Sequence, residues 1–130
     1  MFKRIDHIEL LTAHPQRAID FYTGVLGFKV RLRDRVPGTP LGPLDLVYLD
    51  LGGTTVELMS YPEATLGGRV LEERLGYRMM ALEVEDMDRA LAALKAQGVA
   101  PSWGPVRRPT YARAEIRDPD GNAIELRQWL

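Results

Sequence analysis

The chain has 130 residues, with 17 Lys and Arg against 18 Asp and Glu, a formal net charge of −1. This balance removes the usual electrostatic basis for binding nucleic acid or an anionic membrane. The chain has no cysteine, which excludes disulfides, zinc–thiolate sites, iron–sulfur clusters and thiol nucleophiles. No apolar run reaches the roughly 18 residues of a membrane helix, and no signal peptide is evident, so we expect a soluble, cytoplasmic protein.

The first half of the chain predicts four strands and one helix. The expected strands are residues 4–12, 28–34, 44–51 and 54–60. An amphipathic segment begins at Pro15, a good first helical residue, and ends at Gly27. The proline- and glycine-rich residues 36–43 predict a loop. The Gly-Gly pair 52–53 predicts a tight hairpin turn between the last two strands.

The second half repeats this pattern. The expected strands are residues 78–84, 111–117 and 122–129. Asp86 is a good N-cap for a helix that Gly98 ends. Residues 101–109 are rich in proline and glycine and predict a connector or a lid. The Asp-Pro-Asp-Gly sequence at 118–121 predicts a turn, because proline presets φ and glycine supplies a positive φ.

The two halves resemble each other. A shift of 68 positions moves Val-Glu-Leu at 56–58 onto Ile-Glu-Leu at 124–126. A shift of 72 positions moves Arg-Ala-Ile at 17–19 onto Arg-Ala-Leu at 89–91. We therefore predict an α+β fold in which two tandem βαβββ modules form a curved mixed sheet around a cleft, with the helices on its outer face. The expected modules are residues 1–60 and 77–130, and the linker 61–76 includes a short helical turn at 70–75.

Strand alternation predicts which side chains face the cleft. In the first strand, Ile8 and Leu10 fit the helix-covered face, so His7 and Glu9 face the other way. By the same reasoning Glu57 and Glu125 face the cleft. Imidazole and carboxylate groups are suitable ligands for a divalent cation, so His7, Glu57 and Glu125 are candidate metal ligands.

The sequence resembles the vicinal oxygen chelate superfamily, which includes glyoxalase I, bleomycin-resistance proteins and extradiol dioxygenases. It is closest in motif to the glyoxalase I-like proteins. The segments that carry the resemblance are Ile-Asp-His-Ile at 5–8, Arg-Ala-Ile-Asp-Phe-Tyr at 17–22, Val-Leu-Gly-Phe at 25–28, Val-Glu-Leu at 56–58 and Asp-Pro-Asp-Gly-Asn-Ala-Ile-Glu-Leu at 118–126. These motifs cover essentially the whole chain and are typical of the fold more than of one reaction.

The resemblance implies a metal held by His, Glu, His and Glu on four strands. Positions one, two and four match as His7, Glu57 and Glu125, but Met79 occupies the third. A thioether suits the expected Zn, Ni, Mn or Fe ions poorly. The ion is therefore either held by three ligands or lost. In the second case the carboxylates would pair with arginine, for which the candidates are Arg78, Arg113 and Arg127.

Two functions fit this resemblance. The first is a metal-assisted lyase or isomerase for a small substrate with vicinal oxygens, in which Glu57 or Glu125 moves a proton. The second is a metal-free small-molecule or drug-binding protein of the bleomycin-resistance type. The expected substrate-binding residues are Met79, Trp103, Tyr111 and Arg113. The second function adds further apolar candidates, which are Tyr48, Met59, Tyr61 and Trp129.

The resemblance also implies a homodimer. The sequence leaves open whether each cleft is built within one chain or across two. We expect a small-molecule ligand, no nucleic acid and no membrane partner.

Overall fold

The computed structural model describes residues 1–68 and 75–130. The chain forms two compact units, Met1–Gly68 and Arg69–Leu130, called unit 1 and unit 2 below. The helical turn expected at residues 70–75 lies outside the described residues, apart from Leu75. None of the helices in the described ranges is long and apolar enough to cross a membrane.

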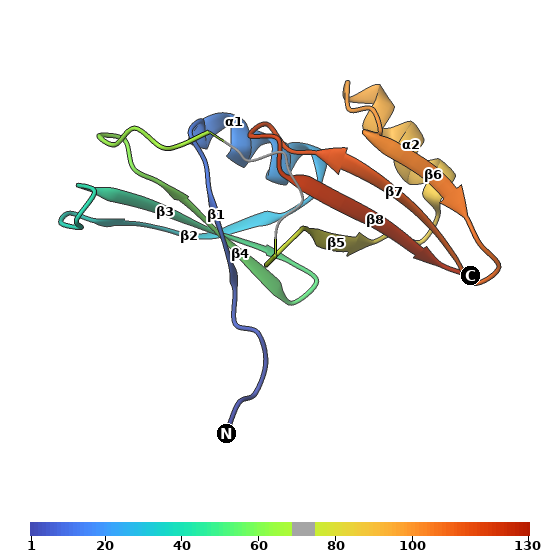
Figure 1. Ribbon diagram of the computed structural model, residues 1–130, viewed down its shortest axis with the longest axis horizontal. Helices are drawn as coiled ribbons and strands as arrows, with labels where there is room; N and C mark the ends of the chain where they lie inside the picture. Colours follow the sequence, from blue (N-terminus) through green and yellow to red (C-terminus); the bar gives the residue numbers. More distant parts are fainter. Residues whose placement is uncertain (69–74) are drawn as a thin grey trace. The chain divides into compact units, whose positions relative to one another are not determined.

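Unit 1 is a four-stranded mixed sheet with one helical segment (Figure 1). Its elements are β1 (Ile8–Leu11), α1 (Pro15–Asp20), the π-helical turn η1 (Phe21–Val25), β2 (Lys29–Val36), β3 (Leu44–Leu51) and β4 (Thr54–Ser60). The strand order is β1-β4-β3-β2, and β1 runs parallel to β4 while the other pairs are antiparallel.

Unit 2 has the same architecture (Figure 1). Its elements are β5 (Met80–Glu83), α2 (Met87–Ala96), β6 (Trp103–Arg107), β7 (Tyr111–Arg117) and β8 (Ala123–Trp129). The strand order is β5-β8-β7-β6, with β5 parallel to β8. The predicted α+β fold of two βαβββ modules is confirmed, and each module forms its own four-stranded sheet.

The two parallel strand pairs share one register. Ile8 pairs with Val56 in unit 1, and Met80 pairs with Ile124 in unit 2. The shifts of 72 and 68 positions found in the sequence carry the first pair onto the second. The internal repeat is therefore structural, and residues at corresponding positions occupy the same face of their sheets.

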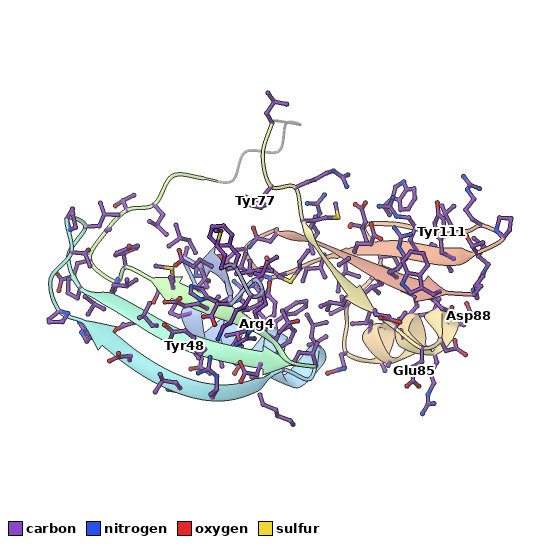
Figure 2. All side chains as sticks on the ribbon, turned by 90° about the horizontal axis from the view of Figure 1, so that it is seen from below. Arg4, Tyr48, Tyr77, Glu85, Asp88 and Tyr111 are labelled. Atoms are coloured by element: carbon purple, nitrogen blue, oxygen red, sulfur yellow. The ribbon has the colours of Figure 1, made fainter. Side chains whose placement is uncertain are left out.

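Alternation along β4 and β8 divides each sheet into two faces. Val56 and Leu58 are buried in unit 1, and Ile124 and Leu126 are buried in unit 2. Each helix contacts the central strand of its own sheet, α1 with β4 and α2 with β8. The glutamates between these apolar residues therefore belong to the face away from the helix. In Figure 2, Tyr111 and the α2 residue Asp88 lie on opposite sides of the second sheet.

Local sequence signals for turns and caps are confirmed. Gly52 and Gly53 have φ angles of 55° and 80°, the positive values that the hairpin turn requires. The Asp86 side chain accepts a hydrogen bond from the Arg89 amide at 2.9 Å and caps α2. Asp118 accepts hydrogen bonds from the amides of Asp120 and Asn122 at 3.0 and 2.8 Å, which fixes the predicted turn.

The strand predicted over residues 4–12 is observed only from Ile8 to Leu11. Two further predicted elements differ from the structure. The segment 101–109 is not a connector, because residues 103–107 form the edge strand β6. Pro105 is accommodated because it lies at the edge of the sheet, where the register shifts between Trp103 and Val106. The helix expected from Pro15 to Gly27 is regular only to Asp20 and continues as η1, in which the Leu26 amide donates to Phe21 O at 3.1 Å.

Candidate functional site

Two adjacent parallel strands of unit 1 bring a histidine and two glutamates together. Glu9 on β1 pairs in register with Glu57 on β4. His7 lies just before β1, and its Nε2 contacts both glutamates. One ligand atom from each of these three residues lies within 4.8 Å of the others, so the group can hold a metal ion.

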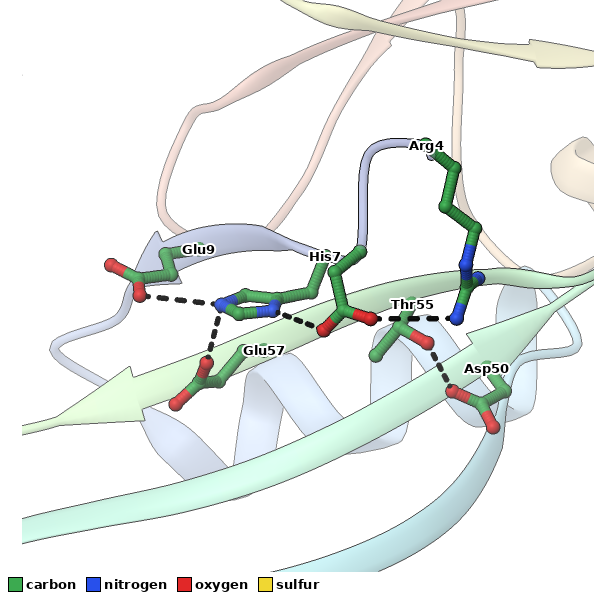
Figure 3. A network of polar contacts seen from close by, with 7 residues as sticks. Arg4, His7, Glu9, Asp50, Thr55 and Glu57 are labelled. Atoms are coloured by element: carbon green, nitrogen blue, oxygen red, sulfur yellow. Dashed lines mark hydrogen bonds and ion pairs between the residues drawn. The ribbon is translucent and has the colours of Figure 1, made fainter. Parts of the chain in front are cut away.

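The contacts within this cluster are short (Figure 3). His7 Nε2 lies 3.0 Å from Glu57 Oε2 and 3.4 Å from Glu9 Oε1. The Glu57 side chain is 7% exposed, the His7 side chain 30% and the Glu9 side chain 59%. The cluster thus has one buried carboxylate at its base and an open side at Glu9.

A third carboxylate contacts the other ring nitrogen of the histidine. Asp6 Oδ2 lies 3.0 Å from His7 Nδ1, and Asp6 Oδ1 lies 3.4 Å from Arg4 Nη2. The hydrogen bonds to Asp6 and Glu9 raise the pKa of His7, and the hydrogen bond to His7 lowers the pKa of Asp6. Without a metal, these carboxylates therefore favour the imidazolium form of His7.

Tyr48 on β3 closes the cluster on the side opposite β1. It pairs in register with Glu57, and its ring meets the His7 ring edge-on at 6.3 Å. Burial, the charge of Glu57 and a hydrogen bond to Glu57 raise the pKa of the Tyr48 hydroxyl. On its other side, the Arg31 guanidinium lies 5.1 Å from the centre of the Tyr48 ring.

A hollow of about 470 Å³ adjoins the cluster and shares Asp6 and Tyr48 with it. Its remaining lining residues are Arg4, Arg31, Leu32, Asp50, Gly53 and Thr55. Arg31 Nε lies 2.8 Å from Asp50 Oδ2. Thr55 Oγ1 donates to Asp50 Oδ1 at 2.8 Å (Figure 3). The hollow is therefore polar, with charges of both signs on its walls.

The donor set of this cluster fits a divalent metal ion. The ligand atoms are one imidazole nitrogen and carboxylate oxygens, which suit borderline and hard divalent cations. A carboxylate on the second ring nitrogen is the usual partner of a metal-bound histidine, because it keeps the proton on that nitrogen. Asp6 occupies this place, so Nε2 is the nitrogen that faces Glu9 and Glu57.

The corresponding face of unit 2 holds a network of arginines and glutamates. Arg113 Nη2 lies 2.9 Å from both Glu125 Oε2 and Glu115 Oε1. Arg127 Nη2 lies 2.5 Å from Glu125 Oε1, and Arg127 Nε donates to the same oxygen at 2.7 Å. Arg78 Nη1 lies 3.6 Å from Glu115 Oε1. All three arginines named from the sequence therefore pair with carboxylates, and two of them pair with Glu125.

Aromatic rings border this network. The Arg113 guanidinium lies 4.8 Å from the centre of the Trp103 ring. The Arg127 guanidinium lies 4.4 Å from the Tyr111 ring and 5.0 Å from the Trp129 ring. Trp103 and Trp129 are 44% and 61% exposed. The face therefore offers flat apolar surface beside paired charges.

The structure brings together some of the residues predicted for the site. His7 and Glu57 meet in unit 1, and Arg113 contacts Glu125 and Trp103 in unit 2. The Met79 thioether is contacted by Arg78 Nη1 at 3.6 Å. Glu125 belongs to unit 2, whereas His7 and Glu57 belong to unit 1. The expected metal site of all three residues stays a prediction.

Three members of the unit 1 site are not among the metal ligands predicted from the sequence. Glu9 shares strand parity with His7, and this signal identified its face but not its contact. Asp6 directly precedes His7, and alternation assigns neighbouring side chains to opposite faces, so it was not selected. Tyr48 was named only as a lining residue, because its pairing with Glu57 depends on the register of β3 against β4.

Comparison with known proteins agrees with this architecture. Residues 4–126 match the family described as Glyoxalase/Bleomycin resistance protein/Dioxygenase superfamily. The chain is 35% identical over 127 residues to a lactoylglutathione lyase of Escherichia coli O157:H7, covering 95% of this chain and 90% of that protein.

Two solved structures show the same fold. A glyoxalase family protein from Enterococcus faecalis is 28% identical with a TM-score of 0.81, covering 97% of this chain and 98% of that one. The glyoxalase I of Leishmania major is 26% identical with a TM-score of 0.74, covering 96% and 86%.

Proposed function

The chain belongs to the Glyoxalase/Bleomycin resistance protein/Dioxygenase superfamily, and on this premise we propose that it is a metal-assisted lyase or isomerase acting on a small substrate with two vicinal oxygens. The observation that carries the proposal is the cluster of His7, Glu9 and Glu57, whose ligand atoms lie within 4.8 Å of one another. The similarity to a lactoylglutathione lyase supports the class of reaction.

The proposed ligands are His7 and Glu57, together with Glu125 as the ligand that the family pattern predicts. Glu9 is a further proposed ligand, because its carboxylate already lies 3.4 Å from His7 Nε2. One imidazole and three carboxylates suit a divalent ion of the Zn, Ni, Mn or Fe class.

A bound ion of this kind would act as a Lewis acid that polarises a substrate carbonyl. Among the chain's own groups, Glu57 is placed to hold and return a proton, because its Oε2 is buried beside His7 Nε2. Tyr48 hydrogen-bonds Glu57 through its hydroxyl, and it also lines the polar hollow that we propose as the substrate site. Glu125 is the second proposed proton carrier.

Metal analysis of the protein purified without a histidine tag tests this proposal. We expect one ion per chain after loading with Zn²⁺, Ni²⁺ or Mn²⁺, and loss of that ion in His7→Ala. The matched control is His14→Ala, since His14 is the other of the two histidines in the sequence and lies outside the cluster. Absence of metal under every loading condition would contradict the proposal. The lyase reaction named for the Escherichia coli relative is the first activity to assay.

A metal-free binding function is the second candidate, and the face of unit 2 favours it. Glu125 is held there by two guanidinium groups, and Met79 stands where the family has a histidine. Trp103, Tyr111 and Arg113 provide aromatic surface and charge for a small organic ligand. This candidate predicts that His7→Ala leaves ligand binding unchanged, whereas Trp103→Ala weakens it.

A further inference from the structure

The hollow beside the unit 1 cluster is lined by two arginines, Arg4 and Arg31. We propose that Arg31, assisted by Arg4, binds a carboxylate group of the substrate, so that the site takes a small organic acid and not a neutral compound. The part of this carboxylate in a reaction rests on the proposed function, because the hollow is the proposed substrate site. Its binding needs no metal.

The backbone of β2 directs Arg31 into the hollow. Val30 and Leu32 both have partners on β3, and the register shifts between them, so Arg31 is the extra residue of a β-bulge. Neighbouring side chains in a regular strand point to opposite faces, but Arg31 and Leu32 both line the hollow. Bulges often lie next to active sites, where they change the direction of a side chain.

The Arg31 guanidinium is held from two sides. Its Nε lies 2.8 Å from Asp50 Oδ2, and its centre lies 5.1 Å from the centre of the Tyr48 ring. Both contacts leave the terminal nitrogens, Nη1 and Nη2, pointing away from Asp50. Within residues 1–68 and 75–130, no carboxylate pairs with either of them. The Arg31 side chain is 51% exposed, so a ligand can reach this end of the group.

The acidic residues of the hollow are already paired, which leaves donors and not acceptors for a ligand. Both oxygens of Asp50 have partners, and so do both oxygens of Asp6, which contacts His7 and Arg4. A guanidinium has only donors, and its planar end matches the two oxygens of a carboxylate. The formal charges of the lining residues balance, so the direction of the Arg31 donors decides what binds.

Arg4 supplies a second, weaker contact. Its Nη2 lies 3.4 Å from Asp6 Oδ1, and its side chain is 64% exposed. In Figure 3, the Arg4 guanidinium points toward the part of the hollow that Thr55 and Asp50 form. The hollow shares Asp6 with the contacts of the metal cluster. A carboxylate bound by the two arginines therefore leaves the rest of a small molecule next to that cluster.

A small carboxylate tests this assignment in the metal-free protein. Glycolate has a carboxylate beside a hydroxyl oxygen, and glycolamide has nearly the same size without the charge. We expect a ¹H–¹⁵N titration with glycolate to shift the backbone amides of Gly53 and Thr55, which line the hollow, and the Nε–H of Arg31. We expect glycolamide to bind at least about tenfold more weakly, because it lacks the charge that strengthens these hydrogen bonds.

Variants of β2 separate the planar donor pair from the charge. We expect Arg31→Gln to weaken glycolate binding about tenfold, and Arg31→Lys, which keeps the charge but not the planar pair, to weaken it less. Arg4→Gln is also expected to have a smaller effect than Arg31→Gln. The matched control is Arg33→Gln, which removes the same charge from the same strand outside the hollow. We expect it to change the affinity less than about twofold, because distant exposed charges are screened.

The outcomes separate this proposal from the metal site. Glycolate that shifts none of these groups, or that binds Arg31→Gln as well as the wild type, overturns the carboxylate site. Equal binding of glycolate and glycolamide also overturns it. If glycolate binds through Arg31 but the protein takes up no metal, the carboxylate site stands and the proposed metal site fails. If metal loads but glycolate binding does not depend on Arg31, the metal site stands and the carboxylate site fails.

Discussion

The two units use one strand register to build two different polar faces. Glu57 and Glu125 occupy corresponding positions on β4 and β8. Across the sheet, Glu57 pairs with Tyr48, whereas Glu125 pairs with Glu115. Two positions further along, the pair is Met59 and Leu46 in unit 1 but Arg127 and Arg113 in unit 2.

The two faces differ in the group that neutralises the buried glutamate, which is Glu57 in unit 1 and Glu125 in unit 2. Arg113 and Arg127 carry a permanent charge, so the partner of Glu125 is built into unit 2. In unit 1, His7 contacts Glu57, and an imidazole can exchange its proton for a metal ion. The same strand arrangement therefore gives Glu57 a partner whose proton can be exchanged for a cation, and gives Glu125 partners with a permanent charge.

The largest expected effect comes from giving unit 2 the apolar residue of unit 1. Arg127→Met places methionine two positions after Glu125, as Met59 stands two positions after Glu57. It leaves the buried Glu125 carboxylate with one partner fewer. We expect the free energy of unfolding to fall by about 3 kcal/mol, because losing one partner of a buried ion pair leaves the Glu125 charge compensated by Arg113 alone. Urea denaturation followed by tryptophan fluorescence reports it, since both tryptophans belong to unit 2.

The control for this prediction is an exposed pair in unit 1. Arg35→Met breaks the ion pair between Arg35 and Asp45. The side chain of Arg35 is 57% exposed and that of Asp45 is 41% exposed. We expect a loss below about 1 kcal/mol, as is usual for exposed pairs. Equal losses in the two variants would show that the network of unit 2 has no special stabilising role.

A smaller effect separates the two carboxylates that complete the proposed metal site. We expect Glu9→Gln to weaken Zn²⁺ binding about tenfold, because its carboxylate lies 3.4 Å from His7 Nε2. We expect Glu125→Gln to weaken it less than about threefold, because Glu125 is already paired with two guanidinium groups in unit 2. Isothermal titration calorimetry on the tag-free variants measures both. A larger effect for Glu125→Gln would mean that the arginine network does not compete with the metal.

The smallest expected effect is a pH dependence that changes sign with metal. The pKa of His7 is raised above 6.5 by its hydrogen bonds to Asp6 and Glu9. In the metal-free protein, the stabilisation from the charged imidazole is complete below 6.5 and is lost as the pH rises through the raised pKa. With Zn²⁺ bound, we expect stability to rise with pH over the same range. The metal binds the neutral imidazole, so it binds more tightly as the pH rises.

Thermal denaturation from about pH 5 to about pH 9 measures both slopes. His7→Gln is expected to flatten the two curves over this range, while His14→Gln is expected to leave them as in the wild type. Parallel curves with and without Zn²⁺ would contradict the assignment of His7 as a ligand.

Much of the fold could be predicted from local sequence signals. β3, β4 and β7 begin and end at the predicted residues, because alternation and the Gly-Gly and Asp-Pro-Asp-Gly turns define them. The sequence does not predict β6, because the prolines and the glycine of segment 101–109 are typical of a loop. These residues are Pro101, Gly104, Pro105 and Pro109. An edge strand tolerates a proline only because its outer side needs no partner, and the sequence does not reveal which strand is at the edge.

For the candidate site, the sequence alone predicts on which face of a strand each glutamate lies. The faces of Glu9, Glu57 and Glu125 follow from strand parity, which is a property of each segment alone. His7 lies just before β1, so parity alone does not fix its direction. The tertiary structure decided their partners. Glu57 meets His7 and Glu9 through the register of β1 and β4. Asp6 contacts His7 because both precede the regular strand. Glu125 pairs with arginines on its own strand and on the neighbouring strand. Contacts between strands depend on register and side-chain reach, which no single segment encodes.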